Sequence, residues 1–340
     1  MTSSLSRRAV LTTLAGVLGL GAAACTARGG ASEGGAGSSE GAAGGGFPLT
    51  LTDCDAEVLI EAVPERVVLL DSAPVTTLDG LGVLDRVVAR AGSFPEGYYD
   101  AELIGRLEQI PMLSEDIDTT GHLQISQEVV MAQGPDLVLG LPDGLTREGL
   151  RAGGAEVLMP RSYCGGLEER ASVDMLFAEI TTYGAVFDRA AEAEALVAAL
   201  RERIDAVADL PHEARTAAVL YASAGGGPLY AYGAPSMATA QLDALGIENV
   251  FADTAQRVFE SGTEPLLAAD PDVVVVLHEG TVPEEQLLAE MLADSQLTSL
   301  RAVQEEAVLP LLFNFTEPAS PLIVDGLERI GAWLTRREPA

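Results

Sequence analysis

Two stretches of the chain, 136 residues apart, carry the same phrase and constrain the fold more than any other feature. Residues 128–140 read EVVMAQGPDLVLG and residues 264–277 read EPLLAADPDVVVVL. In each, a glutamate (Glu128 or Glu264) stands seven positions before a Pro-Asp pair that opens an apolar run. Proline ends a helix, the aspartate can accept hydrogen bonds from backbone amides at the turn, and a short apolar run is typical of a buried strand. The chain therefore contains the same helix, turn and strand twice.

The strand and helix patterns around the two phrases alternate, and the alternation is interrupted once. Apolar runs predict strands, separated mostly by helical segments, at 66–70, 86–90, 136–139, 156–159, 217–221, 273–277 and 307–312. Residues 172–210 instead carry apolar residues at helical spacing with no proline, and Gly184 is a candidate break into two helices. Strands that alternate with helices predict parallel sheets with helices on their faces.

This order predicts an α/β fold with two Rossmann-like lobes, each with a parallel sheet, joined by a single long helix. The boundaries that we expect are a signal peptide at 1–24, a lipid-anchored linker at 25–46, an N-terminal lobe at 47–170, a linking helical segment at 171–210 and a C-terminal lobe at 211–338.

The start of the chain predicts export. Arg7 and Arg8 precede an apolar run of about twelve residues, which is too short to span a bilayer and is typical of a signal peptide. The arginine pair fits a twin-arginine signal or a Sec signal. The next residue after the signal, Cys25, resembles the lipidated cysteine of a lipobox, and ordinary signal cleavage is the alternative. Residues 26–46 are almost all Gly, Ala, Ser and Glu and predict a flexible tether, so we expect a protein anchored by lipid to the outer face of the cell membrane.

The chain is strongly acidic. Its net charge is −31, and it is −33 once residues 1–24, which hold two arginines and no acid, are removed. A surface of this charge repels a phosphate backbone, so nucleic acid is excluded as a partner.

Two cysteines, Cys54 and Cys164, remain when Cys25 is set aside. A pair of cysteines in an exported domain predicts a disulfide. It would close a loop of about 110 residues, which stabilises the fold by about 4–5 kcal/mol in the chain-entropy account.

No metal-centre or active-site motif stands out in the sequence. His122, His212 and His278 belong to separate segments and lack the spacing of a zinc site. The sequence has no nucleophile elbow, P-loop or HExxH motif, and the Gly-rich run at 224–227 leads through Pro228 into a strand-like segment rather than a helix. We therefore expect no enzyme activity, no metal and no cofactor, with an extracytoplasmic enzyme on an α/β fold as a distant alternative.

Four segments carry a resemblance to a known family. They are VPERVVLLDSAPVTTLDGLGVLDRVVAR, LQISQEVVMAQGPDLVLG, ESGTEPLLAADPDVVVVL and EPASPLIVDGLERI. In order and spacing they resemble the periplasmic-binding proteins for iron-siderophores and cobalamin, and the resemblance covers nearly all of residues 57–335. It implies a class III binding-protein fold, in which a ligand is captured in the cleft between two lobes and delivered to an ABC importer.

The same resemblance gives the two repeated glutamates a role. In the family, one exposed glutamate per lobe contacts arginines of the two permease subunits, and Glu128 and Glu264 stand at the matching positions. The alternative is a structural role, because a carboxylate in the first turn of a helix is stabilised by the helix dipole.

The ligand site is expected beyond the carboxyl ends of the strands, where α/β lobes bind ligands. Candidate ligand-binding residues near those ends are Ser72, Arg90, Phe94, Arg161, Tyr163, Tyr230, Tyr232, Arg257, Phe259 and Phe315. Arg161 and Arg257 could neutralise an anionic chelate or form salt bridges, and Tyr98 and Tyr99 could contact ligand or form a surface turn. Family frequency favours a ferric siderophore, with cobalamin, haem or a coenzyme F420 precursor as alternatives, bound by a monomer.

Overall fold

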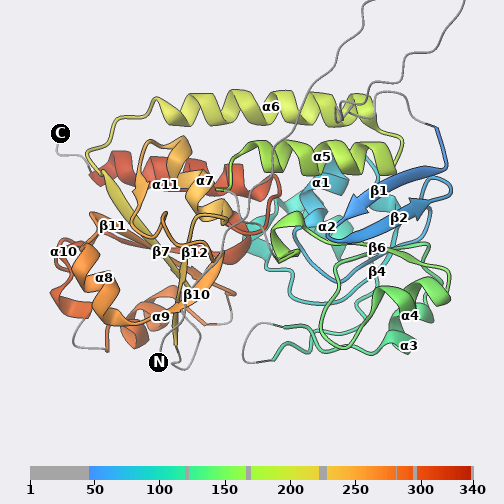
Figure 1. Ribbon diagram of the computed structural model, residues 1–340, viewed down its shortest axis with the longest axis horizontal. Helices are drawn as coiled ribbons and strands as arrows, with labels where there is room; N and C mark the ends of the chain where they lie inside the picture. Colours follow the sequence, from blue (N-terminus) through green and yellow to red (C-terminus); the bar gives the residue numbers. More distant parts are fainter. Residues whose placement is uncertain are drawn as a thin grey trace, which may run out of the picture. The chain divides into compact units, whose positions relative to one another are not determined.

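The computed structural model describes residues 46–118, 122–165, 170–221, 228–280, 282–293 and 297–337. The predicted signal peptide and, apart from Gly46, the predicted linker with Cys25 lie outside these residues, as does the Gly-rich run at 224–227. Across the described ranges, no helix is both long enough and apolar enough to cross a membrane. The chain forms two α/β lobes, each built on its own sheet (Figure 1).

The N-terminal lobe contains a sheet of four parallel strands. Its strand order is β4 (Val87–Arg90), β3 (Val67–Leu69), β5 (Leu137–Leu139) and β6 (Glu156–Leu158). The central strands β3 and β5 are buried throughout, as expected for a parallel sheet covered on both faces. The helical elements of this lobe are α1 (Pro74–Gly80), η1 (Leu84–Arg86), η2 (Glu96–Tyr98), α2 (Ala101–Leu107), α3 (Gln127–Met131), α4 (Arg147–Ala152) and η3 (Arg161–Tyr163).

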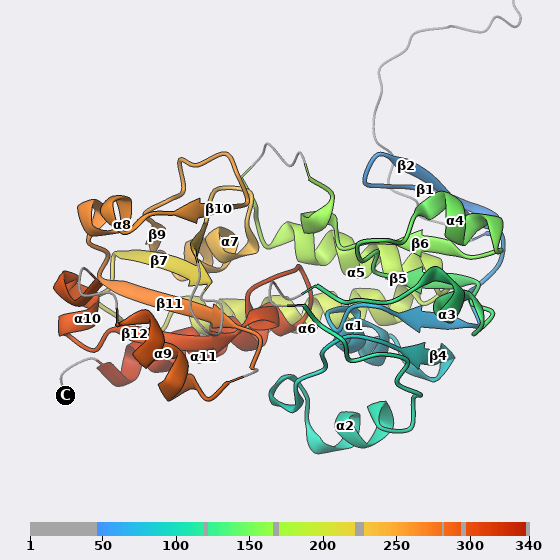
Figure 2. The ribbon, with the colours of Figure 1, turned by 90° about the horizontal axis from the view of Figure 1, so that it is seen from below.

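A β-hairpin that the sequence patterns do not predict precedes this sheet. It pairs β1 (Leu49–Asp53) with β2 (Ala56–Ile60) in antiparallel register. Its strands alternate between more and less exposed residues and so lack the continuous apolar run of the sheet strands. The hairpin lies beside the edge strand β6 (Figures 1 and 2).

The C-terminal lobe contains a mixed sheet rather than a purely parallel one. Its order is β10 (Val258–Ser261), β8 (Leu229–Tyr232), β7 (Thr216–Tyr221), β11 (Val273–His278) and β12 (Val308–Leu312), with β9 (Glu248–Asn249) beside β7. The strands β7, β9, β11 and β12 are parallel, whereas β8 and β10 add an antiparallel edge. The helical elements are α7 (Met237–Ala244), α8 (Thr263–Ala269), α9 (Glu284–Met291), η4 (Leu297–Ser299), α10 (Arg301–Gln304), η5 (Phe313–Phe315) and α11 (Leu322–Arg337).

The two Pro-Asp pairs hold equivalent places in the two lobes. Asp136 accepts hydrogen bonds from the backbone N–H groups of residues 65 and 66, which lead into β3. Asp272 accepts hydrogen bonds from the backbone N–H groups of residues 215 and 216, which lead into β7. Each aspartate therefore bonds the start of the neighbouring strand and not its own turn, so the repeated pair ties adjacent parallel strands together.

The linking segment contains two helices. The helices α5 (Asp174–Val186) and α6 (Ala190–Ala208) pack side by side (Figure 1). The predicted break at Gly184 is wrong, because the chain turns at Asp188, which has a left-handed φ of 53°. Gly184 lies inside α5, where a Cβ atom would come 2.5 Å from the Cβ of Ala193. The glycine is therefore needed for the close approach of the two helices.

The helix α6 contacts both lobes and is the single long connection. In its first half, the Leu196 side chain packs against α1. In its second half, Arg203 forms ion pairs with Asp325 and Glu328 of α11 at 2.5 and 2.8 Å. The predicted two lobes joined by one long helix are thus confirmed.

Gly184→Ala is expected to lower the free energy of unfolding by roughly 1–3 kcal/mol, because the new Cβ overlaps Ala193. Gly105→Ala makes the same change inside α2, where nothing lies within 4 Å of the new Cβ, and helix propensity predicts a gain of roughly 0.5–1 kcal/mol. Urea denaturation measures both. Equal effects of the two substitutions would contradict the close packing of α5 on α6.

Candidate functional site

The two lobes meet where β3 and β12 end. Ser72 follows β3, and Asn314 lies in η5 directly after β12. The Asn314 side-chain amide donates a hydrogen bond to Ser72 Oγ at 2.9 Å, and its backbone N–H donates to the Tyr98 hydroxyl at 2.9 Å. The Tyr98 and Phe315 rings meet edge to face at 5.2 Å. Two predicted ligand residues, Ser72 and Phe315, are therefore buried in this lobe-to-lobe contact.

A second contact between the lobes is built around Arg257, which precedes β10. Its guanidinium carbon lies 5.1 Å from the centre of the Tyr163 ring in the N-terminal lobe, and its Nη1 lies 3.3 Å from Glu317 Oε2. Glu317 is fully buried, and burial raises the pKa of its carboxyl while Arg257 opposes the rise. The sequence predicts that Arg257 either neutralises an anionic chelate or forms a salt bridge, and the structure contains the salt bridge. Tyr232, also predicted, is buried beside this pair.

Two further carboxylates lie at strand ends. Asp71 follows β3 and accepts a hydrogen bond from the backbone N–H of Ala73 at 2.8 Å. Glu279 follows β11, and its carboxyl is hydrogen-bonded to Tyr221, which ends the neighbouring strand β7. Burial, together with the Asp71 charge, raises the pKa of Glu279 to about 7. The two carboxylates, one from each lobe, therefore lie close enough to repel each other.

These carboxylates are absent from the sequence-based prediction. Asp71 and Glu279 could have been predicted, because they stand one or two residues after buried apolar strands and the rule about strand ends applies to acids as well as to aromatics. Glu317 carries no such signal, because its partner Arg257 is sixty residues away in the sequence.

One wall of the N-terminal lobe brings together Arg90, Phe94 and Tyr99. The guanidinium of Arg90 lies 4.9 Å from the Phe94 ring centre, and the Tyr99 hydroxyl donates to the Ser72 carbonyl oxygen at 3.3 Å. Burial raises the pKa of Tyr99, and the charge of Asp71 adds to the rise. Tyr99 therefore faces the inter-lobe carboxylates rather than forming a surface turn.

The remaining predicted residues have their described contacts within their own lobes. Phe259 packs edge to face on Phe251 at 5.5 Å. Tyr230 lies opposite Glu260 in the β8–β10 ladder. Arg161 is exposed on η3, and its backbone N–H donates to the carboxylate of Glu179.

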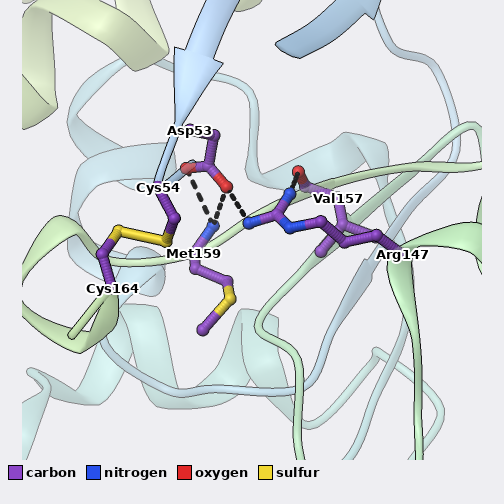
Figure 3. Close-up of a disulfide and its surroundings, with 6 residues drawn as sticks. All are labelled: Asp53, Cys54, Arg147, Val157, Met159 and Cys164. Atoms are coloured by element: carbon purple, nitrogen blue, oxygen red, sulfur yellow. Dashed lines mark hydrogen bonds and ion pairs between the residues drawn. A yellow bond between two sulfur atoms is a disulfide. The ribbon is translucent and has the colours of Figure 1, made fainter. Parts of the chain in front are cut away.

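A disulfide holds the segment that carries Tyr163 (Figure 3). It joins Cys54, in the turn of the β1–β2 hairpin, to Cys164, with the Cα atoms 4.9 Å apart. Beside it, the Asp53 carboxylate forms an ion pair with Arg147 and accepts a hydrogen bond from the backbone N–H of Met159 at 3.3 Å. The hairpin turn is therefore fixed to the chain that leaves β6.

A small pocket lies beside the inter-lobe contact. It has an empty volume of about 200 Å³ and is lined by residues of both lobes, namely Ala73, Pro74, Thr77, Pro160, Glu179, Tyr183, Ala319 and Ser320. The part of this space that a water-sized sphere can occupy is only about 10 Å³, room for about one water molecule, which is far below the roughly 300 Å³ at which small-molecule sites begin. We therefore define the inter-lobe site by its polar and aromatic side chains: Asp71, Arg90, Phe94, Tyr99, Tyr163, Tyr221, Tyr232, Arg257, Glu279 and Glu317.

The histidines have separate surroundings. His278 is buried at the end of β11, where burial lowers its pKa, and its Nε2 lies 3.7 Å from Glu284. The His212 ring is hydrogen-bonded to the carbonyl oxygens of Ala214 and Leu245. In the part of the chain that the structure describes, no group of three or more His, Cys, Asp or Glu residues could hold a metal ion.

Comparisons with known proteins agree on one family. The profile of the family described as periplasmic binding protein matches residues 67–311. A structure described as an ABC-type Fe3+-hydroxamate transport system from Saccharomonospora viridis is 50% identical, covers 84% of this chain and 99% of its own, and has a TM-score of 0.80. A cobalamin-binding protein of Halobacterium salinarum is 27% identical over 293 residues, which are 84% of this chain and 73% of the relative.

A more distant structure shows the fold alone. The apo form of a periplasmic heme-binding protein from Roseiflexus is 20% identical, covers 80% of this chain and 98% of its own, and has a TM-score of 0.62.

Thermal stability should fall as the pH rises from 6 to 9, in part because Glu179 loses a proton. Burial, with the Asp53 charge, raises the pKa of Glu179 to about 8, so its stabilising effect is complete below its ordinary pKa of 4.5 and is lost as the pH passes 8. Between pH 6 and pH 9, the melting temperature of Glu179→Gln should fall by roughly 2–4 °C less than that of the wild type. Glu128→Gln, at an exposed position on α3, is the control. Equal falls in the wild type and Glu179→Gln would show that the carboxyl is already ionised at pH 6.

Proposed function

The chain belongs to the periplasmic binding protein family, and we propose that it is the substrate-binding lipoprotein of an ABC importer that captures a ferric siderophore between its lobes. One observation carries the choice of ligand: the 50% identity, over 84% of this chain, to the structure described as an Fe3+-hydroxamate transport system. The lipobox-like Cys25 and the Gly-rich stretch that follows support a lipid anchor at the outer face of the membrane.

The charges of the inter-lobe site support a neutral or cationic chelate over an anionic one. Arg257 is already neutralised by the buried Glu317, and Arg90 stacks on Phe94. Among the described residues, no arginine forms an ion pair with Asp71 or Glu279. An anionic chelate would add negative charge beside two carboxyl groups whose pKa values burial already raises, which is costly, whereas a protonated amine would favour their ionised forms.

The aromatic side chains of the site support the same class of ligand. Tyr99 lies near Asp71, Tyr221 near Glu279 and Tyr163 near both, and aromatic side chains of this kind attract cations and pack on the apolar backbone of a hydroxamate chelate. Cobalamin is the second candidate, favoured by the cobalamin-binding relative.

A ligand panel tests this proposal. Ferrioxamine E, a neutral ferric trihydroxamate, and ferrioxamine B, which carries a protonated amine, should raise the melting temperature, since a ligand at one hundred times its Kd stabilises by about 2.7 kcal/mol. Ferric enterobactin, an anionic catecholate, should not. Asp71→Asn with Glu279→Gln should lower the preference for ferrioxamine B over ferrioxamine E by about tenfold, or about 1.4 kcal/mol, whereas the exposed Asp85→Asn should not.

Two results of the panel would contradict the proposal. Cyanocobalamin and haemin complete the panel, and a response to one of them without a response to either ferrioxamine would replace the ferric hydroxamate with that ligand. Chemical conversion of the chelate during incubation, seen by mass spectrometry, would favour the enzyme alternative.

We also propose that Glu128 and Glu264 dock the protein on the permease. Both are exposed in the first turn of a short helix, α3 or α8, that precedes a Pro-Asp pair. Val129, next to Glu128, is 41% exposed and adds an apolar contact surface. One carboxylate on each lobe fixes the orientation of docking as well as adding attraction.

Glu128→Ala combined with Glu264→Ala is expected to retain wild-type affinity for the chelate and to lose most uptake of labelled iron by cells. The matched control combines Glu148→Ala and Glu285→Ala, which remove exposed first-turn glutamates from α4 and α9, one in each lobe. It should transport normally. Normal transport by the first variant, or equal loss by both, would defeat the docking proposal.

A further inference from the structure

The segment that carries Tyr163 has little regular structure of its own. It leaves β6 at Leu158 and contains a single 3-10 turn, in which the N–H of Tyr163 donates to the Pro160 carbonyl oxygen at 2.8 Å and the N–H of Cys164 donates to that of Arg161 at 3.2 Å. The Tyr163 ring nevertheless forms the contact with Arg257 across the lobes. The contacts that hold residues 159–164 in place therefore also hold Tyr163 in place at the inter-lobe site.

Three ties hold this segment to the N-terminal lobe. Cys164 is bonded to Cys54, the N–H of Met159 donates to Asp53, and the N–H of Arg161 donates to Glu179 of α5. Two of the three end on adjacent residues of the β1–β2 hairpin, Asp53 at the end of β1 and Cys54 in the turn (Figure 3). The hairpin turn is thus the main anchor of the segment.

The hairpin turn is itself held firmly. Asp53 and Arg147 form an ion pair whose side chains are 10% and 18% exposed, and Arg147 also donates to the Val157 carbonyl oxygen of β6 at 2.7 Å. Cys54 has a φ of 54°, a left-handed conformation that a residue with a Cβ adopts only where its surroundings impose it. The anchor therefore moves with the N-terminal sheet.

We propose that the Cys54–Cys164 disulfide is a positioning device for ligand binding, which holds Tyr163 against Arg257 before the ligand arrives. The inference rests on the proposed function only in placing the ligand at the inter-lobe site. A side chain that is already ordered need not be immobilised on binding, and this saving corresponds to roughly three- to tenfold in affinity. A disulfide that only stabilises the fold would leave the affinity of the folded protein unchanged.

A double-mutant cycle separates the two roles. Cys54→Ser with Cys164→Ser should weaken the binding of ferrioxamine E, measured by calorimetry, by roughly three- to tenfold. In the Tyr163→Ala background the same pair of changes should have no further effect, because the ring to be positioned is gone. Val207→Ala, in the buried face of α6, is the control for lost stability and should bind as the wild type does. Wild-type affinity without the disulfide, or equal losses in both backgrounds, would overturn the proposal.

Hydrogen exchange tests the positioning without any ligand. When the disulfide is removed, the amides of residues 159 and 161–164 should exchange faster by at least about tenfold more than the amides of α6, which report the fall in global stability. Unchanged exchange in this segment would overturn the inference. If the wild-type protein bound no member of the panel, the proposed function would fail, and the exchange rates would still decide whether the disulfide orders the Tyr163 segment.

Discussion

The arrangement of the inter-lobe site depends on the hydrogen bonds and the ion pair of one buried carboxylate, that of Glu317. A fully buried carboxylate is costly unless several donors satisfy it. Its donors are the Ser236 hydroxyl and the Met237 N–H at the start of α7, with Arg257 as its ion-pair partner. These contacts fix the position of Arg257, and Arg257 in turn meets Tyr163 of the other lobe. The charge of Arg257 first suggests a site for an anion. In the structure, Arg257 instead forms part of the contact between the lobes.

The two parts of the repeated sequence have different roles. The Pro-Asp pair organises the sheet, and the glutamate lies at the surface. Asp136 and Asp272 bond the backbone that leads into β3 and β7, so each lobe begins its sheet in the same way. Parallel strands that start together also end together, and their carboxyl ends deliver Asp71 in one lobe and Glu279 in the other to the inter-lobe site. Glu128 and Glu264 contribute to neither contact and remain exposed on the surface.

The predictable and unpredictable parts of the fold differ in how local their causes are. The strands β3, β5 and β11 are buried along their whole length, and such runs are visible in the sequence. The β1–β2 hairpin is half exposed, and its place is set by the contacts of Asp53 and Cys54 with residues over ninety positions away. The cysteine pair could be proposed from composition and export, but its link to Tyr163 required the path of the chain after β6.

Some residues of the site could likewise be predicted from the sequence, and others could not. Tyr163, Tyr232 and Arg257 could be selected because they stand near strand ends, and the structure brings these three together. Ser72 and Phe315 also stand near strand ends, and they form the direct contact between the lobes with Asn314 and Tyr98. A rule about strand ends identifies the edge of the sheet but not which side chains the opposite lobe covers. The acidic character of the site is not visible in the sequence because the burial of Asp71, Glu279 and Glu317 depends on how the two lobes come together.

Each side of the Tyr163–Arg257 contact is fixed within its own lobe by a different kind of bond. Tyr163 is held through a covalent link to the hairpin, and Arg257 is held through the hydrogen-bonded Glu317. Only α6 joins the lobes as a long helix, and its packing on α1 and on α11 resists bending. Under the proposed function, two walls that are already ordered would leave ligand selection to the charges and rings at the strand ends rather than to a large rearrangement. Under the proposed function, the pair of carboxylates contributed by the two lobes sets which charge the ligand can carry.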